Sequence, residues 1–250
     1  MSKLVFLGTS NAVPDVEREN THLVLVGERS TVLIDTGHNP LVRLRQAGVD
    51  PLAVSDAFLT HFHPDHVSGM PSFLMNNWLL GRRAALDLYG HPVTLRSLNF
   101  LMELYSWHNW PDFYPVNFHF LDESHMELAL QDGEFRIFSA PVQHMIPAIG
   151  LRLEHLPSGM ALAYSGDTSP CQAVLDLAHQ ADVLVHEAGG GGYGHSSAAQ
   201  AGWSARQAGA HSLRLVHYAT QSNIAALVEE AQAEFDGPVA AAVDFEVLEF

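Results

Sequence analysis

The stretch LTHFHPDHVSG, residues 59–69, decides the fold of this sequence. It places His61, His63, Asp65 and His66 within six positions, and all four side chains can bind metal ions. The residues before the cluster are typical of a buried strand and those after it of a helix, so the cluster is expected on the connecting loop. In an extended segment His61 and His63 point to the same side, while Asp65 and His66 lie at the start of the helix. Two neighbouring sets of ligands suggest two metal ions.

Three more polar residues stand at the ends of strand-like apolar runs further along the chain. They are His144 in APVQH, Asp167 in AYSGDT and His217 in LVHY. Loops that converge at one edge of a sheet would bring them to the motif. Imidazoles and carboxylates without thiolates indicate zinc, manganese or iron in a catalytic site with an open position. Eight other histidines are expected to be ordinary core or surface residues: His22, His91, His108, His119, His125, His155, His179 and His211.

The patterns around the motif indicate an α/β (α+β) fold. Strands are expected over residues 3–8, 22–27, 31–37 and 56–62, and residues 239–250 read as one last strand. Helices are expected over 68–81, 92–107, 170–180, 196–209 and 222–235. No linker or repeat divides the sequence, and the tract Gly189 to Gly192 is its one low-complexity stretch. Residues 1–250 are therefore expected to form a single domain.

Charge argues against broad binding to nucleic acid. The net charge is −16, from 28 acidic and 12 basic residues, and only Lys3 is a lysine. Proteins that bind polyanions usually present a basic stripe. Here the one tight basic pair is Arg82-Arg83, with Arg43 and Arg45 as a looser second pair. Bound divalent cations would offset part of the acidity.

Nothing in the sequence predicts a membrane segment or a signal peptide. Apolar runs stay well below the ~20 residues that span a bilayer, and the opening KLVFLGTS reads as a strand. The single cysteine, Cys171, cannot form an internal disulfide. A cytoplasmic location without membrane contact is expected.

The motif resembles the signature of the metallo-β-lactamase superfamily. Together, FLGTSNAVP…REN, LIDTG, APVQH, SGDT, HEAG…HSS and LVHY resemble its ribonuclease Z branch, in order from residue 4 to about 220. The resemblance implies a four-layer αββα sandwich with a dinuclear, usually zinc, centre at one rim. The implied ligands of one ion are His61, His63 and His144; those of the other are Asp65, His66 and His217, with Asp167 bridging the two.

The resemblance also implies an acid–base pair in HEAGGGGYGHSS. His195 would protonate the leaving oxygen and Glu187 would orient it, and a histidine suits proton transfer near neutral pH. The alternative is that His195 merely precedes the cap of the next helix. The expected catalytic residues are therefore Asp65, Glu187 and His195. Asp35 in LIDTG resembles the family's buried support for the motif loop, with a turn-forming aspartate as the alternative.

Two departures from ribonuclease Z disfavour tRNA as the substrate. That branch grips the tRNA elbow with a long arm inserted between the motif histidine and the bridging aspartate, and only 22 residues separate His144 from Asp167. Family members also often carry an arginine shortly after the last histidine, whereas HYATQSN has none. An exosite elsewhere would still allow RNA to bind.

Segment 76–115 carries an aromatic cluster of Trp78, Trp107, Trp110, Phe113 and Tyr114. Such a cluster walls an active-site pocket or mediates contact between two copies, and a homodimer is expected. Ordinary core packing is the alternative for about half of these rings.

The expected function is that of a dinuclear metal-dependent hydrolase, most simply a phosphodiesterase of ribonuclease Z type that uses a metal-bridging hydroxide. The expected cofactors are two divalent ions, zinc or else manganese or iron, and the expected substrate is a small or short phosphodiester. Open alternatives are a lactonase or sulfatase acting on an ester-like bond, a tRNA 3′-end endonuclease, and a module that only stores or senses metal. Glu187 and His195 argue against the last, because pure binding needs no proton donor.

Overall fold

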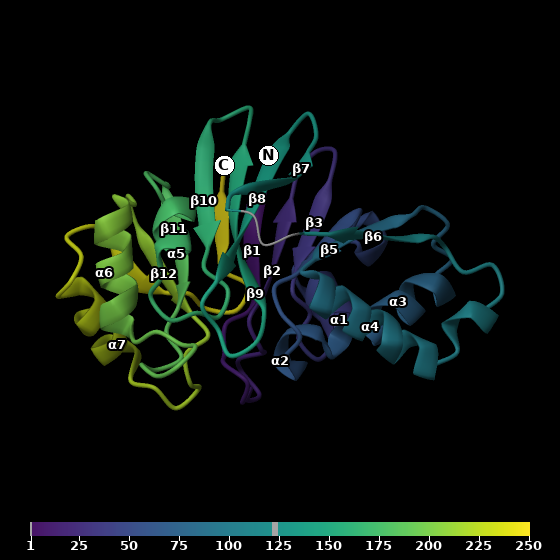
Figure 1. Cartoon of the computed structure of the whole chain (residues 1–250), viewed down its shortest axis with the longest axis horizontal. Helices are drawn as coiled ribbons and strands as arrows, with labels where there is room; N and C mark the ends of the chain where they lie inside the picture. Colours follow the sequence, from purple (N-terminus) through teal and green to yellow (C-terminus); the bar gives the residue numbers. More distant parts are fainter. Residues whose placement is uncertain (1, 122–124) are drawn as a thin grey trace.

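Two seven-stranded β-sheets packed face to face form the framework in a computed structural model, which describes residues 2–121 and 125–250 (Figure 1). The first sheet has the order β14 (Val247–Glu249), β1 (Lys3–Gly8), β2 (His22–Val26), β3 (Thr31–Ile34), β4 (Asp56–Leu59), β5 (Leu86–Gly90) and β6 (Val116–Phe120). The second has the order β13 (Val239–Ala241), β12 (Leu213–Val216), β11 (Val183–Glu187), β10 (Met160–Tyr164), β9 (Ala148–His155), β8 (Phe135–Val142) and β7 (Glu127–Gln131).

Helices cover the outer face of each sheet, as Figure 1 shows on its two flanks. The first sheet carries α1 (Pro40–Gln46), α3 (Gly69–Leu79) and α4 (Pro92–Leu104), and the second carries α5 (Gln172–Leu177), α6 (Ala198–Ala208) and α7 (Ile224–Gln232). The short helices are α2 (Pro64–Val67) and the 3₁₀ turns η1 (Pro51–Ala53) and η2 (Trp107–Asn109). In the described residues no helix is both long and apolar enough to cross a membrane. The layers confirm the predicted four-layer αββα sandwich.

Apolar residues on both faces of the strands explain why the sheets stack in this way. In β1, Leu4 and Phe6 face the core between the sheets, while Val5 and Leu7 face the core under the helices. All four are at most 1% exposed, and burying a side chain of this size stabilises the fold by roughly 1.5–3 kcal/mol. A strand that is apolar on both faces is stable only between two other layers.

The helices predicted from the sequence are present, and their observed ends lie within a few residues of the predicted ends. Capping residues explain where they start. The hydroxyl of Ser197 accepts a hydrogen bond from the Gln200 N–H, and the Gln200 side chain accepts one from the Ser197 N–H, a capping box that begins α6. Gly209, at a φ of 66°, ends the same helix.

The single strand expected over residues 239–250 is wrong. Residues Val239–Ala241 join the second sheet as β13, and Val247–Glu249 join the first as β14. Between them the chain turns at Phe245, whose φ is 68°. Both segments are apolar enough for a strand, and a pattern of apolar residues cannot tell which sheet each one joins.

The predicted basic pair Arg82-Arg83 is not a surface patch. Arg82 is 5% exposed and donates to the carbonyl oxygens of Val54 at 2.7 Å and Ala84 at 2.8 Å. Its guanidinium carbon also lies 5.1 Å from the centre of the Tyr114 ring. A buried cation needs such partners, so Arg82 is a structural residue and only Arg83 reaches solvent.

The aromatic cluster of segment 76–115 packs within the helical layer. Trp107 and Tyr114 belong to the core under the helices, and Trp78 stacks on Trp110 with ring centres 5.2 Å apart. A cavity of about 360 Å³ lies between Trp107, Trp110 and Phe113. None of the predicted metal ligands lines this cavity, so core packing explains these rings better than a wall of the active site.

Candidate metal centre and active site

The motif loop follows β4 at one rim of the sandwich. His61 and His66 are fully buried, and His63 is half-buried. Pro64 stands at the first position of α2, where its missing N–H removes no helical hydrogen bond. The loop therefore turns sharply into a helix and keeps its side chains close together.

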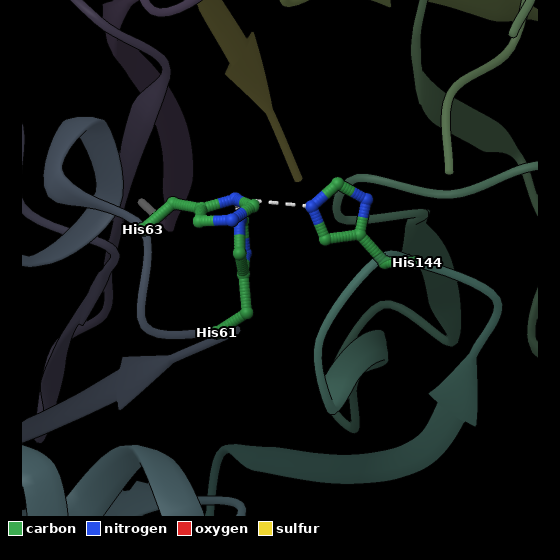
Figure 2. A group of neighbouring side chains, drawn as sticks. All are labelled: His61, His63 and His144. Atoms are coloured by element: carbon green, nitrogen blue, oxygen red, sulfur yellow. Dashed lines mark hydrogen bonds between the residues drawn. The ribbon is translucent and has the colours of Figure 1, made fainter. Parts of the chain in front are cut away.

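His61, His63 and His144 bring three imidazoles together from two loops (Figure 2). His63 Nδ1 lies 3.0 Å from His61 Nε2 and 3.1 Å from His144 Nε2. Two ligand atoms of a tetrahedral zinc ion with bonds of 2.0–2.1 Å lie about 3.3 Å apart. The three nitrogens are thus spaced as ligands of one ion would be.

A second group contains Asp65, His66, Asp167 and His217. Asp65 Oδ2 lies 3.4 Å from His66 Nε2 and 3.3 Å from His217 Nε2. Asp167 Oδ2 lies 3.4 Å and 3.2 Å from the same two nitrogens. These spacings also match the edges of a tetrahedral ligand shell.

Asp167 lies between the two groups. Its Oδ2 atom is 3.8 Å from His61 Nε2 in the first group as well as close to both histidines of the second. Asp167 Oδ1 and His66 Nε2 are buried without a hydrogen-bond partner in the described part of the chain. A buried polar atom without a partner costs roughly 1–3 kcal/mol. The residues of the two groups therefore fit divalent metal binding, with Asp167 within reach of both groups.

Burial keeps the first group in the protonation state that binds metal. Burial is the main cause that lowers the pKa of His61, His63 and His144, and neighbouring histidines lower it further. Burial pulls the pKa of Asp65 upward, but hydrogen bonds with His217 and His66 hold it well below its ordinary value. Neutral imidazoles and ionised carboxylates are the forms that ligate metals.

Asp35 holds the motif loop through buried hydrogen bonds. This agrees with the predicted role as a buried support of the loop, and not with the alternative of an ordinary turn residue. It is fully buried, and its Oδ1 accepts a hydrogen bond of 2.8 Å from the Thr60 N–H. Its Oδ2 lies 2.9 Å from His66 Nδ1. Such partners fix the orientation of a metal-ligating imidazole. Asp35 adopts a φ of 60°, a conformation that aspartate tolerates better than most residues.

His195 and Glu187 lie beside the two ligand groups. His195 Nδ1 is 3.0 Å from Glu187 Oε1 and 4.0 Å from Asp167 Oδ2. The His195 ring stacks on His217 with centres 5.5 Å apart and an angle of 10° between the planes. The hydrogen bond with Glu187 is the main cause that raises the pKa of His195. His195 precedes the Ser197 cap of α6, as the alternative interpretation predicted, and it also lies beside His217 and Asp167 of the second group.

Glu187 is held by the backbone around it. Its Oε1 accepts hydrogen bonds from the Thr168 N–H at 3.1 Å and the Ser196 N–H at 2.9 Å, and its Oε2 accepts one from the Gly189 N–H at 2.7 Å. A fully buried carboxylate with these partners cannot turn away from His195. The pair is thus preorganised.

Some supporting contacts were not predicted from the sequence. His144 Nδ1 lies 2.6 Å from the Gly194 carbonyl oxygen, and the Gly194 N–H donates to Ser169 Oγ at 2.8 Å. Thr60 Oγ1 lies 3.0 Å from His61 Nδ1. Thr60 and Gly194 adjoin predicted residues in sequence, which is the one signal that points to them. None of the eight histidines predicted to be ordinary belongs to a metal-binding group within the described residues.

The sequence matches the Anti-Pycsar protein Apyc1 family over residues 2–235. It is 27% identical to ribonuclease Z of Methanothermobacter thermautotrophicus, over 92% of this chain and 91% of that protein. That alignment is 286 positions long, longer than this 250-residue chain, so the relative contains insertions that this chain lacks.

Two solved structures resemble the whole chain. The Bacillus subtilis metallo-β-lactamase fold protein YhfI has a TM-score of 0.83 and 20% identity, over 100% of this chain and 99% of that one. Human tRNase Z, short form, has a TM-score of 0.79 and 25% identity, over 99% and 98%. The chain therefore belongs to the Anti-Pycsar protein Apyc1 family, and it is a metal-dependent hydrolase of the ribonuclease Z-like branch of the metallo-β-lactamase superfamily.

Proposed function

We propose that the chain is a dinuclear phosphodiesterase that acts on a small phosphodiester. The observation that carries the proposal is the position of Asp167 between two ligand groups, with His195 Nδ1 4.0 Å from its carboxylate. One ion would be held by His61, His63 and His144 and the other by Asp65, His66 and His217, with Asp167 shared.

Zinc is the proposed metal, because imidazole and carboxylate ligands at tetrahedral spacing suit it. Manganese and iron accept the same ligand types and would be distinguished by elemental analysis. Two such ions supply Lewis-acid stabilisation of charge on the phosphoryl oxygens and activate water near neutral pH.

His195 is the proposed proton donor to the leaving oxygen. Its Nδ1 faces Glu187 Oε1, so the proton to be transferred is carried on Nε2. Glu187 orients the ring and stabilises its protonated form, as a carboxylate does for a catalytic histidine. Asp65, on the second ligand group, is proposed to act both as a ligand and in catalysis, because its carboxylate lies 3.3 Å from His217 Nε2.

The proposed substrate is small because the chain offers little for a polynucleotide to bind. Arg82 is buried, the net charge is −16, and the connection from His144 to Asp167 is filled by β9 and β10 with a short turn between them. An enzyme that holds RNA through many phosphates needs a cation for each. tRNA 3′-end cleavage remains the second candidate, favoured by the relatives named ribonuclease Z.

A panel of small substrates tests the proposed reaction. The zinc-loaded protein should hydrolyse bis-p-nitrophenyl phosphate faster than a lactone or an aryl sulfate of similar size. A preference for the lactone or the sulfate would instead support the lactonase or sulfatase function. Metal binding without turnover of any substrate would favour a storage or sensing role.

Precursor tRNA is expected to be a poor substrate relative to a small phosphodiester, because the acidic surface repels a polyanion. Any tRNA binding should weaken with salt, by a log–log slope of roughly −0.7 for each single-stranded phosphate contacted. Turnover of both substrates at rising salt measures this. Tight tRNA binding at physiological salt, with cleavage at the 3′ end, would contradict the expectation and establish an exosite.

We also propose that two copies associate through the outer face of α4. Phe100 and Leu104, one helical turn apart, are each about two-thirds exposed there. An apolar face of this kind is unusual on a monomer, and a two-fold axis would pair it with itself. With a net charge of −16, two copies repel each other least where the surface is apolar.

Replacing Phe100 and Leu104 together by glutamate should convert a dimer into a monomer, because it places four charges in the interface. Light scattering coupled to size exclusion measures the mass. Leu128→Glu is the control, since Leu128 is exposed on β7 in the other sheet. A wild-type protein that is monomeric at high micromolar concentration would contradict the dimer.

The path of the C-terminal strands supports the single domain predicted for residues 1–250. The chain builds the second sheet from β7 to β13 and then returns to the first sheet with β14, so the first sheet combines strands from both ends of the chain. A cytoplasmic location stays a prediction from the sequence.

A further inference from the structure

His217 lacks a support that three other candidate ligands have. In each of those histidines the ring nitrogen not directed at its metal group, Nδ1, has a close partner: Thr60 Oγ1 at 3.0 Å for His61, Asp35 Oδ2 at 2.9 Å for His66 and the Gly194 carbonyl at 2.6 Å for His144. His217 Nδ1 is buried and has no hydrogen-bond partner among the described residues. Such a partner normally fixes the orientation of a ligand imidazole. Apart from its stacking on His195, the His217 ring is therefore positioned by its own backbone.

The backbone of His217 is held in an unfavourable conformation. Its φ is 56°, in the left-handed region that residues other than glycine rarely adopt and keep only where their surroundings enforce it. The His217 N–H donates to the Thr9 carbonyl oxygen at 2.8 Å, and the Asn11 N–H donates to the Tyr218 carbonyl oxygen at 3.2 Å. The connection between β1 and β2 thus holds the chain at His217.

The carboxylate of Asp244 joins the two ends of this connection. Asp244 Oδ1 accepts a hydrogen bond of 2.7 Å from Thr9 Oγ1, and Asp244 Oδ2 accepts one of 2.9 Å from the Glu19 N–H. The Glu19 carbonyl oxygen in turn accepts from the N–H groups of Thr9 at 3.0 Å and Ser10 at 2.9 Å. Thr9 is fully buried, so its position depends on these contacts.

Arg43 fixes Asp244 in place. The Arg43 guanidinium pairs with Asp244 Oδ2, and the two side chains are 15% and 7% exposed. Arg43 Nε also donates to the Leu7 carbonyl oxygen at 2.7 Å, and its guanidinium carbon lies 4.0 Å from the centre of the Phe245 ring. A buried carboxylate with a charged partner is strongly oriented. Arg43, which the sequence suggests as part of a basic pair, is thus a structural residue.

We propose that Asp244 is a positioning residue for the second metal group: through Thr9 it holds the backbone of His217 so that Nε2 is directed at the metal ion. The inference rests on the proposed dinuclear centre. Asp244 lies between β13 and β14, outside residues 2–235 over which the chain matches its family. It belongs to neither ligand group, so its loss should weaken the second ion and leave the first unchanged.

Thr9→Val tests the link, because it replaces the hydroxyl that joins Thr9 to Asp244 by a methyl group of similar size. Competition with a chromophoric chelator should show roughly tenfold weaker affinity for one of two zinc ions, as for loss of a partner behind a metal ligand. Thr9→Ser keeps the hydroxyl and should retain both ions as in the wild type. Asp244→Ala should repeat the Thr9→Val loss or exceed it, since it also releases Glu19.

Two further backgrounds identify the affected ion. In His144→Ala the first group lacks a ligand, so the tighter remaining ion reports on the second group. In His217→Ala the remaining ion reports on the first group. Thr9→Val should weaken the remaining ion roughly tenfold in His144→Ala and leave it unchanged in His217→Ala. A general loss of stability would act in both backgrounds.

Glu246→Gln is the matched control. Glu246 lies in the same connection as Asp244, but its carboxylate pairs with Arg214 at 2.9 Å. This variant should retain both ions. Turnover of bis-p-nitrophenyl phosphate by Thr9→Val should fall at limiting zinc and recover with excess zinc, because the ligands themselves are intact. Thermal unfolding in the presence of a metal chelator shows that each variant is folded before metal is added.

The outcomes separate this inference from the proposed function. If Thr9→Val weakens the remaining ion equally in both backgrounds, or in neither, Asp244 does not position His217, while the dinuclear centre stands. The same conclusion follows if Thr9→Ser loses as much affinity as Thr9→Val. A wild-type protein that binds fewer than two ions would contradict the proposed centre and this inference together.

Discussion

Replacing His195 by alanine is expected to lower turnover of a phosphodiester with an alkyl leaving group by roughly 10²–10⁴-fold, the usual contribution of a general acid. An alkoxide is a poor leaving group, so it depends on the proton that His195 would supply. Steady-state kinetics on methyl 2,2,2-trifluoroethyl phosphate and on an unactivated dialkyl phosphate measure the loss. The loss should be largest for the unactivated substrate.

Three controls separate a missing acid from a damaged site. Metal content should not change, because His195 is outside both proposed ligand groups. The loss should shrink for bis-p-nitrophenyl phosphate, whose leaving group needs little protonation. Glu187→Gln should lower turnover less than His195→Ala, since glutamine can still accept a hydrogen bond from Nδ1. Unaltered activity of His195→Ala on the dialkyl substrate would assign the acid to another residue.

Asp167→Ala is expected to empty both metal sites together. Asp167 Oδ2 lies within 3.8 Å of His61 Nε2 in one group and within 3.4 Å of two histidine nitrogens in the other. Loss of even an outer partner of a metal ligand commonly costs 10–100-fold in affinity, so loss of a shared ligand should cost more than about 100-fold at each site. Elemental analysis after dialysis should fall from about two ions per chain toward none.

Asp176→Ala is the matched control, because Asp176 is a partly exposed carboxylate on α5 and belongs to none of the candidate metal-binding groups of the described residues. It should keep two ions. His144→Ala should lose one ion more readily than the other, since His144 belongs to one ligand triad only. One ion or none in metal-replete wild type, or two ions in Asp167→Ala, would contradict a shared dinuclear centre.

The sequence was sufficient to predict the fold, and the residues it predicted for the site lie together in the structure. His61, His144, Asp167 and His217 each follow an apolar strand closely, and these strand ends meet at one rim of the two sheets. His61 and His66 show this most directly, since the strand before them and the helix after them are both strongly marked. The family resemblance then supplied the grouping into two triads and the role of His195.

Properties that depend on packing were not visible in the sequence. Arg82 looks like half of a basic patch, but it is buried against a segment that includes the Val54 carbonyl, 28 residues earlier in the chain. The segment 239–250 reads as one strand because both of its ends are apolar. The contact from His144 to the Gly194 carbonyl joins residues 50 positions apart. In each case the deciding partner is distant in the chain, where no local pattern reports it.

The pairing of β1 with β14 bears on how the molecule matures on the ribosome. Residues Lys3 to Val5 pair with Val247 to Glu249, and the Phe250 N–H donates to the Ser2 carbonyl oxygen. One edge of β1 therefore stays unpaired while the ribosome synthesises the more than two hundred residues between β1 and β14. An open strand edge is a site of aggregation, and contacts this distant in sequence slow folding. Nascent chains of this protein should consequently depend on chaperones until β14 has left the exit tunnel.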